Sequence, residues 1–142
     1  MQYARSSWSR TLVYALACAT LFVACGGDGD DDEPTPPTFT EIYDGILSVR
    51  CADAICHGSG GFGMNFTSRD AAYASLVGVT AQGPSCGTSG ATRVVPGNPD
   101  ASLMYQKLLP NVPCGSRMPG APLDDADMER IADWIEAGAA ND

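Results

Sequence analysis

The apolar positions between residues 39 and 140 repeat with helical spacing and nowhere alternate over the length of a strand. The first helical stretch opens on a capping-box pattern, in which Thr38 is followed three residues later by Glu41. Its apolar side chains fall on one helical face: Phe39, Ile42, Ile46 and Val49. We expect this helix to lead directly into Cys51.

Three more stretches predict short helices. One spans residues 68–77, and its inward positions are Ala72, Tyr73, Leu76 and Val77. The next follows a cap at Asn98 or Asp100. This helix carries Leu103, Met104, Lys107 and Leu108. The last begins at a cap on Asp124 and stops near Gly138. Its core positions are Met128, Ile131, Trp134 and Ile135.

Long loops separate these helices, at residues 58–63, 82–97 and 110–122. The expected fold is therefore all-α, a small domain of about four short helices with long loops that covers residues 39–142. So few short helices bury little apolar surface, and such domains usually need a covalent staple.

The amino terminus is typical of an export signal. Arg5 and Arg10 precede a thirteen-residue apolar stretch at 12–24, which is short for a transmembrane helix. Ala24 and Cys25 close this stretch in a way that resembles the lipobox of bacterial lipoproteins, although Phe22 stands where that motif usually has Leu. The resemblance implies that residues 1–24 are removed and that Cys25 is acylated. A plain secretory signal or an uncleaved anchor is the alternative.

Residues 25–38 combine acids and prolines without apolar side chains that could pack. This composition predicts a disordered tether between the lipid and the folded domain. The expected location is therefore outside the cytoplasm, in the periplasm or at the cell surface, held to a membrane by the lipid anchor on Cys25.

Charge excludes one class of partner. The formal net charge is -9, and only two of the eight basic residues precede Cys25, whereas all seventeen acids follow it. After removal of the signal, 6 basic and 17 acidic residues leave a charge of about -11. A nucleic-acid-binding protein needs a basic surface, so we expect no nucleic-acid partner.

The most specific local pattern is Cys51, four intervening residues, Cys56 and then His57, the only histidine of the chain. Two thiols followed by a histidine are typical of covalent haem attachment, in which the thiols bind the vinyl groups and the histidine ligates iron. The usual spacing has two intervening residues. A local disulfide between Cys51 and Cys56, stabilising by roughly 2 kcal/mol, is the alternative.

The carboxyl-terminal half resembles the small class I cytochromes c. The resemblance rests on Arg117-Met118-Pro119, on Leu123 and on the helix that ends with residues 131–139. It implies that Met118 is the distal iron ligand opposite His57 and that the cofactor is haem c. A methionine thioether as sixth ligand favours reduced iron and raises the reduction potential.

Shorter blocks extend the resemblance to the cytochrome c-like domains of exported bacterial lipoproteins. They cover residues 51–58, 73–77, 93–99, 102–103, 107–108 and 117–139. On this resemblance the walls around the haem include Tyr73, Leu76, Leu103, Leu108 and Trp134. The widened cysteine spacing is the one departure, and a domain of this shape could carry a disulfide in place of the thioether bonds.

Cys86 and Cys114 take no part in the haem motif that the resemblance implies. Sequence alone does not fix the pairing of cysteines. We expect a Cys86–Cys114 disulfide that ties the loop before Arg93 to the loop carrying Met118, stabilising by roughly 3–4 kcal/mol.

No catalytic motif supports an enzyme, since the chain has no His-Glu-x-x-His, no nucleophile elbow and no phosphate-binding loop. The sequence predicts instead a membrane-tethered, monohaem c-type electron-transfer protein with His57 and Met118 on the iron and a redox protein as its partner. The alternative is a haem-free, disulfide-stapled module of the same shape that binds or scaffolds at the cell surface.

Overall fold

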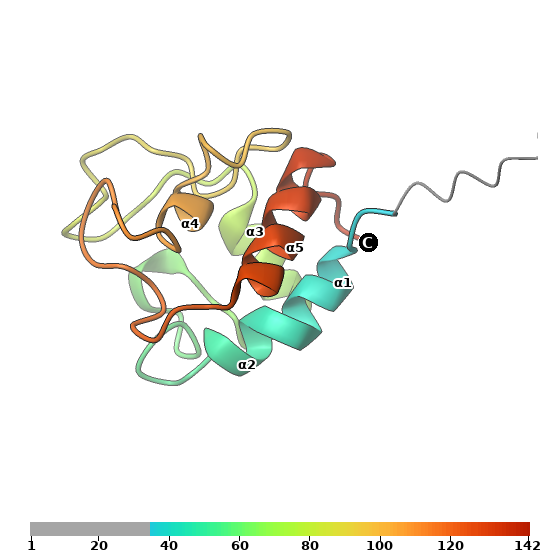
Figure 1. Ribbon diagram of the computed structural model, residues 1–142. Helices are drawn as coiled ribbons and strands as arrows, with labels where there is room; N and C mark the ends of the chain where they lie inside the picture. Colours follow the sequence, from blue (N-terminus) through green and yellow to red (C-terminus); the bar gives the residue numbers. More distant parts are fainter. Residues whose placement is uncertain (1–34) are drawn as a thin grey trace, which may run out of the picture. The chain divides into compact units, whose positions relative to one another are not determined.

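The computed structural model describes residues 35–142 (Figure 1). The predicted signal peptide at 1–24, the predicted lipidation site Cys25 and all but the last four residues of the predicted tether lie outside the described residues. The described part is built from short helices and long loops, in which no strand forms and only two isolated bridges occur, Val77 with Val94 and Thr80 with Thr92. None of its helices is long and apolar enough to cross a bilayer.

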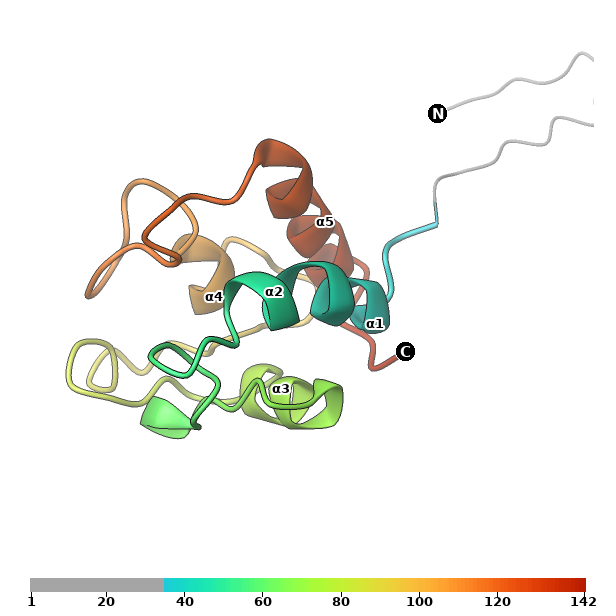
Figure 2. The ribbon, with the colours of Figure 1, turned by 90° about the horizontal axis from the view of Figure 1, so that it is seen from below.

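The first helical segment runs through three consecutive pieces: α1 (Phe39–Ile42), a π-helical turn η1 (Tyr43–Leu47) and α2 (Ser48–Arg50), seen end to end in Figure 2. The predicted capping box is confirmed. The Thr38 hydroxyl accepts a hydrogen bond from the Glu41 amide at 3.2 Å, and the Glu41 carboxylate accepts one from the Thr38 amide at 2.9 Å. As expected, the segment ends next to Cys51, whose amide donates to the Leu47 carbonyl at 3.0 Å.

The π turn changes which face of this segment is buried. Ile42 and Ile46 are buried as predicted, but so is Leu47, while Val49 is 70% exposed. The placement of Val49 on the core face is therefore wrong. A π turn carries more residues than an α turn, so side chains after it are rotated away from the 3.6-residue register on which the prediction depended.

The second helix, α3 (Arg69–Leu76), begins at Ser68, whose hydroxyl accepts from the Ala71 amide. Ala72 and Leu76 are buried, as expected. A 3-10 turn, η2 (Gly61–Gly63), precedes it in the glycine-rich loop.

The third helix, α4, is shorter than expected and covers only Leu103–Gln106. Neither Asn98 nor Asp100 caps it, so that prediction is wrong. The Asn98 side chain instead accepts from the Ala101 amide in the preceding turn. Ser102 occupies the N-cap position without capping, because its hydroxyl accepts from the Val95 amide at 2.8 Å.

The last helix, α5 (Asp125–Glu136), starts at the predicted cap, where the Asp124 carboxylate accepts from the Asp127 amide at 2.8 Å. It ends just before Gly138, which adopts a φ of 108°. Ile131, Trp134 and Ile135 are buried, and Met128 packs at the edge of the core.

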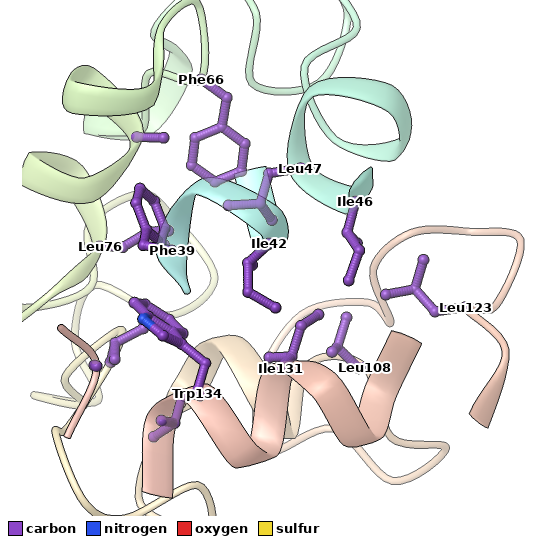
Figure 3. Packing of buried hydrophobic residues seen from close by; sticks show 14 residues of the cluster. Phe39, Ile42, Ile46, Leu47, Phe66, Leu76, Leu108, Leu123, Ile131 and Trp134 are labelled. Carbon is purple, nitrogen blue, oxygen red and sulfur yellow. The ribbon is translucent and has the colours of Figure 1, made fainter. Parts of the chain in front are cut away.

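The core lies where α5 packs on α1, with α3 beside them (Figure 3). Phe39 is at its centre: its ring stands 5.1 Å from the ring of Trp134 and 5.1 Å from that of Tyr73. Gly45 faces α5, since a Cβ at this position would contact the Arg130 guanidinium at 3.4 Å. The end of the chain is fixed to the same region by hydrogen bonds from Tyr73 to the Ala139 carbonyl and from Trp134 to the Ala140 carbonyl.

Candidate functional site

A pocket of about 460 Å³ opens between the segment that follows α2 and the loop that joins α4 to α5. Its walls are mainly apolar. They come from η1, α3, α4, α5 and the loops between these helices: Leu47, Phe66, Leu76, Leu103, Leu108, Leu123 and Ile131. Its volume and apolar lining are those of sites that bury a compact organic ligand.

The four residues predicted from sequence to hold haem all line this pocket. Cys51, Cys56 and His57 reach it from the segment after α2, and Met118 reaches it from the loop before α5. The fold therefore brings together two groups of residues that are far apart in the sequence.

The two additional residues between the cysteines are absorbed by a turn around Asp53. Its carbonyl accepts hydrogen bonds from the amides of Cys56 and Gly58, both at 2.9 Å. Its carboxylate accepts from the Ile55 amide at 3.0 Å, which closes the bulge. Ile55, at the tip of the bulge, is 92% exposed and stands at the mouth of the pocket.

Gly58 is required by this turn. A Cβ at Gly58 would lie 2.2 Å from the Ala52 carbonyl oxygen, a backbone atom that cannot move aside cheaply. The amide of the preceding residue, His57, donates to the Cys51 carbonyl at 3.2 Å. The tight turn therefore holds the backbone of His57 against that of Cys51.

The His57 ring is ready to act as a ligand. It packs on Phe66 with the ring centroids 5.1 Å apart, and Nδ1 is buried without a hydrogen-bond partner. Burial lowers the pKa of His57, and the charge of Arg93 lowers it further. The imidazole is therefore neutral near pH 7, which is the form that ligates metals.

The two cysteines of the motif are thiols in this structure, and the alternative Cys51–Cys56 disulfide does not form. Cys51 is partly buried, and this burial raises the pKa of its thiol to about 11. Cys56 is exposed at the pocket mouth.

Met118 is held at the pocket rim by the loop backbone. Its amide donates to the Lys107 carbonyl at 2.8 Å, and the Arg117 guanidinium donates to the Leu108 carbonyl at 2.7 Å. The Met118 side chain is 43% exposed, so it lines the pocket from the solvent side. Met64 and Met104 also line the pocket.

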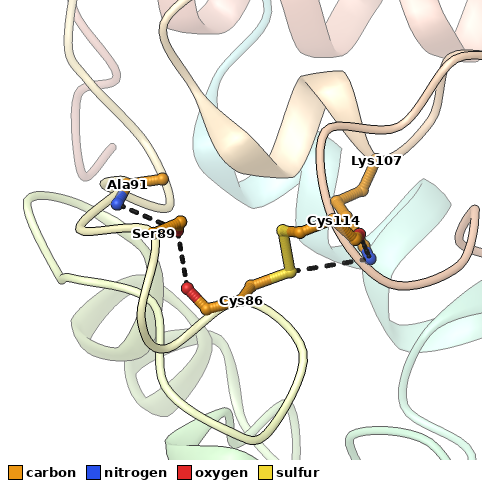
Figure 4. The surroundings of a disulfide bond; sticks show 5 residues. All are labelled: Cys86, Ser89, Ala91, Lys107 and Cys114. Carbon is orange, nitrogen blue, oxygen red and sulfur yellow. Dashed lines mark hydrogen bonds between the residues drawn. A yellow bond between two sulfur atoms is a disulfide. The ribbon is translucent and has the colours of Figure 1, made fainter.

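Cys86 and Cys114 form a disulfide (Figure 4). It joins the loop after α3 to the loop that carries Met118, as expected. Residues 83–86 on one side of it, and residues 115, 116 and 118–120 on the other, line the same pocket. The Lys107 ammonium lies against the bridge, donating to the Cys114 carbonyl at 2.7 Å and approaching Cys86 Sγ at 4.0 Å.

Charge is distributed unevenly around the pocket. Residues 39–142 contain six basic and twelve acidic residues. Three of the six bases line the pocket, namely Arg50, Arg93 and Lys107, and none of the acids does. Arg93 is 4% exposed and donates to the carbonyls of Gly63 and Ser75 at 2.8 and 2.7 Å. In an acidic chain, this lining favours an occupant with negative charge.

Two of the five predicted wall residues are wrong. Leu76, Leu103 and Leu108 line the pocket, but Tyr73 and Trp134 do not, because both pack on Phe39 in the core. Sequence reasoning also missed Phe66, Arg93 and Lys107 as lining residues. No local pattern signals them, because each reaches the pocket through a tertiary contact.

Comparison with known proteins gives no further guide: no family model, no curated sequence and no solved structure matches the chain. Within residues 35–142, no group of three or more His, Cys, Asp or Glu side chains is arranged to hold a bare metal ion.

Proposed function

We propose that the chain is a membrane-tethered, monohaem c-type cytochrome-like protein that transfers electrons. Cys51 and Cys56 would bind the haem vinyl groups, His57 and Met118 would ligate the iron, and a lipid on Cys25 would hold the protein to the membrane. Its all-α domain would be a variant of the class I cytochrome c fold with a widened attachment motif.

The observation that carries this proposal is that one apolar pocket is lined by both thiols, by the only histidine and by Met118. The residues present fit a haem in three further respects. His57 has a buried nitrogen without a partner, the wall is mainly aliphatic and aromatic, and three cations but no carboxylate line the pocket. Haem is a flat apolar ring with two carboxylates and matches each of these features.

The residues of the chain have separate tasks in this function. His57 provides a neutral imidazole whose position is set by the Asp53 turn and by packing on Phe66. Met118 provides a soft, neutral thioether from the opposite loop. Such a ligand favours the reduced state of the iron. When bound, haem supplies the one-electron couple.

Exposure at the pocket mouth suits electron transfer. Ile55, Cys56 and Met118 are all exposed there, so one edge of a bound haem would be reachable by a redox protein partner. With both axial positions filled from the chain, no iron site would remain for a substrate. Electron transfer is therefore favoured over catalysis.

The test is to export the full chain in a bacterial host that co-expresses a c-type haem attachment system, and to purify it in detergent. We expect the absorption bands of a c-type haem and a haem stain that survives denaturing electrophoresis. The matched control is the Cys51→Ala/Cys56→Ala chain, which is expected to lose the stain.

A folded, colourless protein from this host would overturn the proposal. The haem-free module held by disulfides would then be the better description, and thiol counting would show whether Cys51 and Cys56 had paired.

A further inference from the structure

Lys107 is a buried cation inside the candidate site. It follows α4, is 7% exposed and lines the pocket. Lysine is almost never this deeply buried unless a partner compensates its charge, because removing an ammonium from water is costly.

The described part of the chain supplies no such counter-charge. The Lys107 ammonium donates to the Cys114 carbonyl and approaches the Cys86 sulfur, both of which are neutral groups. The ion pairs of residues 35–142 are Arg69 with Asp70 and Arg130 with Asp127, and no acid lines the pocket. Two N–H bonds of the ammonium are therefore left without a strong acceptor.

The surroundings of Lys107 are arranged to hold its ammonium in place. The disulfide fixes Cys114, whose carbonyl orients the ammonium. Gly115 follows with a φ of 62°, and a Cβ there would come within 3.0 Å of the Lys107 nitrogen and 3.1 Å of the Ser85 side chain. Because Gly115 has no side chain, the loop leaves room around the Lys107 ammonium, which a larger residue at this position would crowd.

We propose that Lys107 binds a carboxylate of the pocket's occupant, and that the Cys86–Cys114 bridge positions the ammonium for this contact. The assignment rests on the proposed function, under which the carboxylate is one of the two haem propionates. Lys107 would then set how the porphyrin is oriented, with its propionate edge toward the disulfide and its vinyl groups toward the thiols.

The experiment compares two ligands on matched proteins. In the full chain carrying Cys51→Ala and Cys56→Ala, porphyrin binding is reversible, so dissociation constants can be measured by absorption titration. The ligands are ferric protoporphyrin IX and its dimethyl ester, which lacks both carboxylates. The further variants are Lys107→Met, Lys107→Arg and, as a control cation outside the pocket, Arg130→Met.

We expect the parent protein to prefer the free acid over the ester, and Lys107→Met to reduce that preference by roughly tenfold or more, which is the range for a hydrogen bond to a charged group. Lys107→Arg should retain most of the preference, and Arg130→Met should retain all of it. Both the porphyrin carboxylates and the Lys107 side chain are changed. The loss of preference for the free acid therefore measures the contact between them.

Folding is checked separately by denaturation without porphyrin. Replacing a buried cation that lacks a counter-charge by Met should leave the haem-free protein at least as stable. If Lys107→Met keeps the full preference for the free acid, the carboxylate assignment is wrong while the haem proposal stands. If the parent protein binds neither porphyrin and the chain with both cysteines carries no haem stain after export, the proposed function fails and takes this assignment with it.

Discussion

At the scale of single residues, Met118 is the side chain on which the proposed iron ligation depends most. It reaches the pocket from a loop and is 43% exposed, whereas His57 is fixed by a tight turn. We expect Met118→Ala to keep covalently attached haem but to lose the weak red-end absorption band of a methionine–iron bond. The reduction potential should fall as well, because the thioether favours reduced iron.

The matched control is Met128→Ala, which removes a methionine that packs at the core edge and does not line the pocket. This variant should keep the red-end band. Survival of the band in Met118→Ala would contradict the assignment, and Met64 and Met104, which also line the pocket, would then be tested in turn.

Gly58 gives a second prediction at this scale. Gly58→Ala places a Cβ 2.2 Å from the Ala52 carbonyl oxygen, so the turn around Asp53 must distort. We expect a loss of about 1–3 kcal/mol in the free energy of unfolding, measured by urea denaturation. Gly120→Ala is the control, since nothing lies within 4 Å of a Cβ at that position. Equal stability of the two variants would show that the tight turn is not required.

The sequence predicted the candidate site best at the level of single residues. Cys51, Cys56, His57 and Met118 could be named from their chemistry and order, because haem attachment uses few residue types in a recognisable arrangement. Arg93 and Lys107 could not be named. A basic residue in a loop or after a short helix is usually solvated, and only the folded chain shows that these two are buried beside the same pocket.

At the scale of elements, helix caps were predicted well where they are local. Thr38 with Glu41, and Asp124 with Asp127, form their hydrogen bonds within one turn, so the sequence contains both partners. Two other features were missed, because no residue pattern of this kind signals them. The π turn at Tyr43–Leu47 shifts the buried face away from Val49, and the Ser102 hydroxyl bonds to the Val95 amide instead of capping α4.

The cap of α5 provides the test at this scale. Asp124→Ala removes the carboxylate that accepts from the Asp127 amide at 2.8 Å and leaves that donor without its partner. We expect the free energy of unfolding to fall by about 0.5–2 kcal/mol, measured by urea denaturation. Asp133→Ala, an exposed position further along the same helix, should change it by no more than about 0.5 kcal/mol. A larger effect at Asp133 than at Asp124 would contradict the capping role.

At the scale of the whole molecule, the pocket has helices behind it and loops in front. Leu76 and Ile131 join the pocket wall to the core around Phe39, and Cys51 packs against that core, whereas Met118 comes from a loop outside the core cluster. The Cys86–Cys114 disulfide links the Met118 loop to the loop after α3, at a sequence separation of 28. Stability and ligand geometry should therefore depend on the same covalent bond.

Replacing both cysteines tests this coupling. In Cys86→Ser/Cys114→Ser, the unfolded chain regains the freedom of the open loop, and we expect a loss of roughly 3–4 kcal/mol in the free energy of unfolding. The Met118 loop keeps its backbone bond to the Lys107 carbonyl but loses the bridge that holds residues 114–118 against the opposite loop. The methionine–iron band of the haem-loaded protein should therefore weaken with temperature sooner than in the parent.

Reductant offers an independent check on the same protein. Mild reduction of the haem-free parent should reproduce the loss of stability, whereas the haem-free Ser/Ser variant should not respond, because it has no Cys86–Cys114 bond to cleave. A Ser/Ser variant as stable as the parent, with an unchanged methionine–iron band, would mean that the loops are held by the core and by the bound haem alone. The loops at the front of the pocket would then be as rigid as the helices behind it, and they would not need the disulfide to stabilise them.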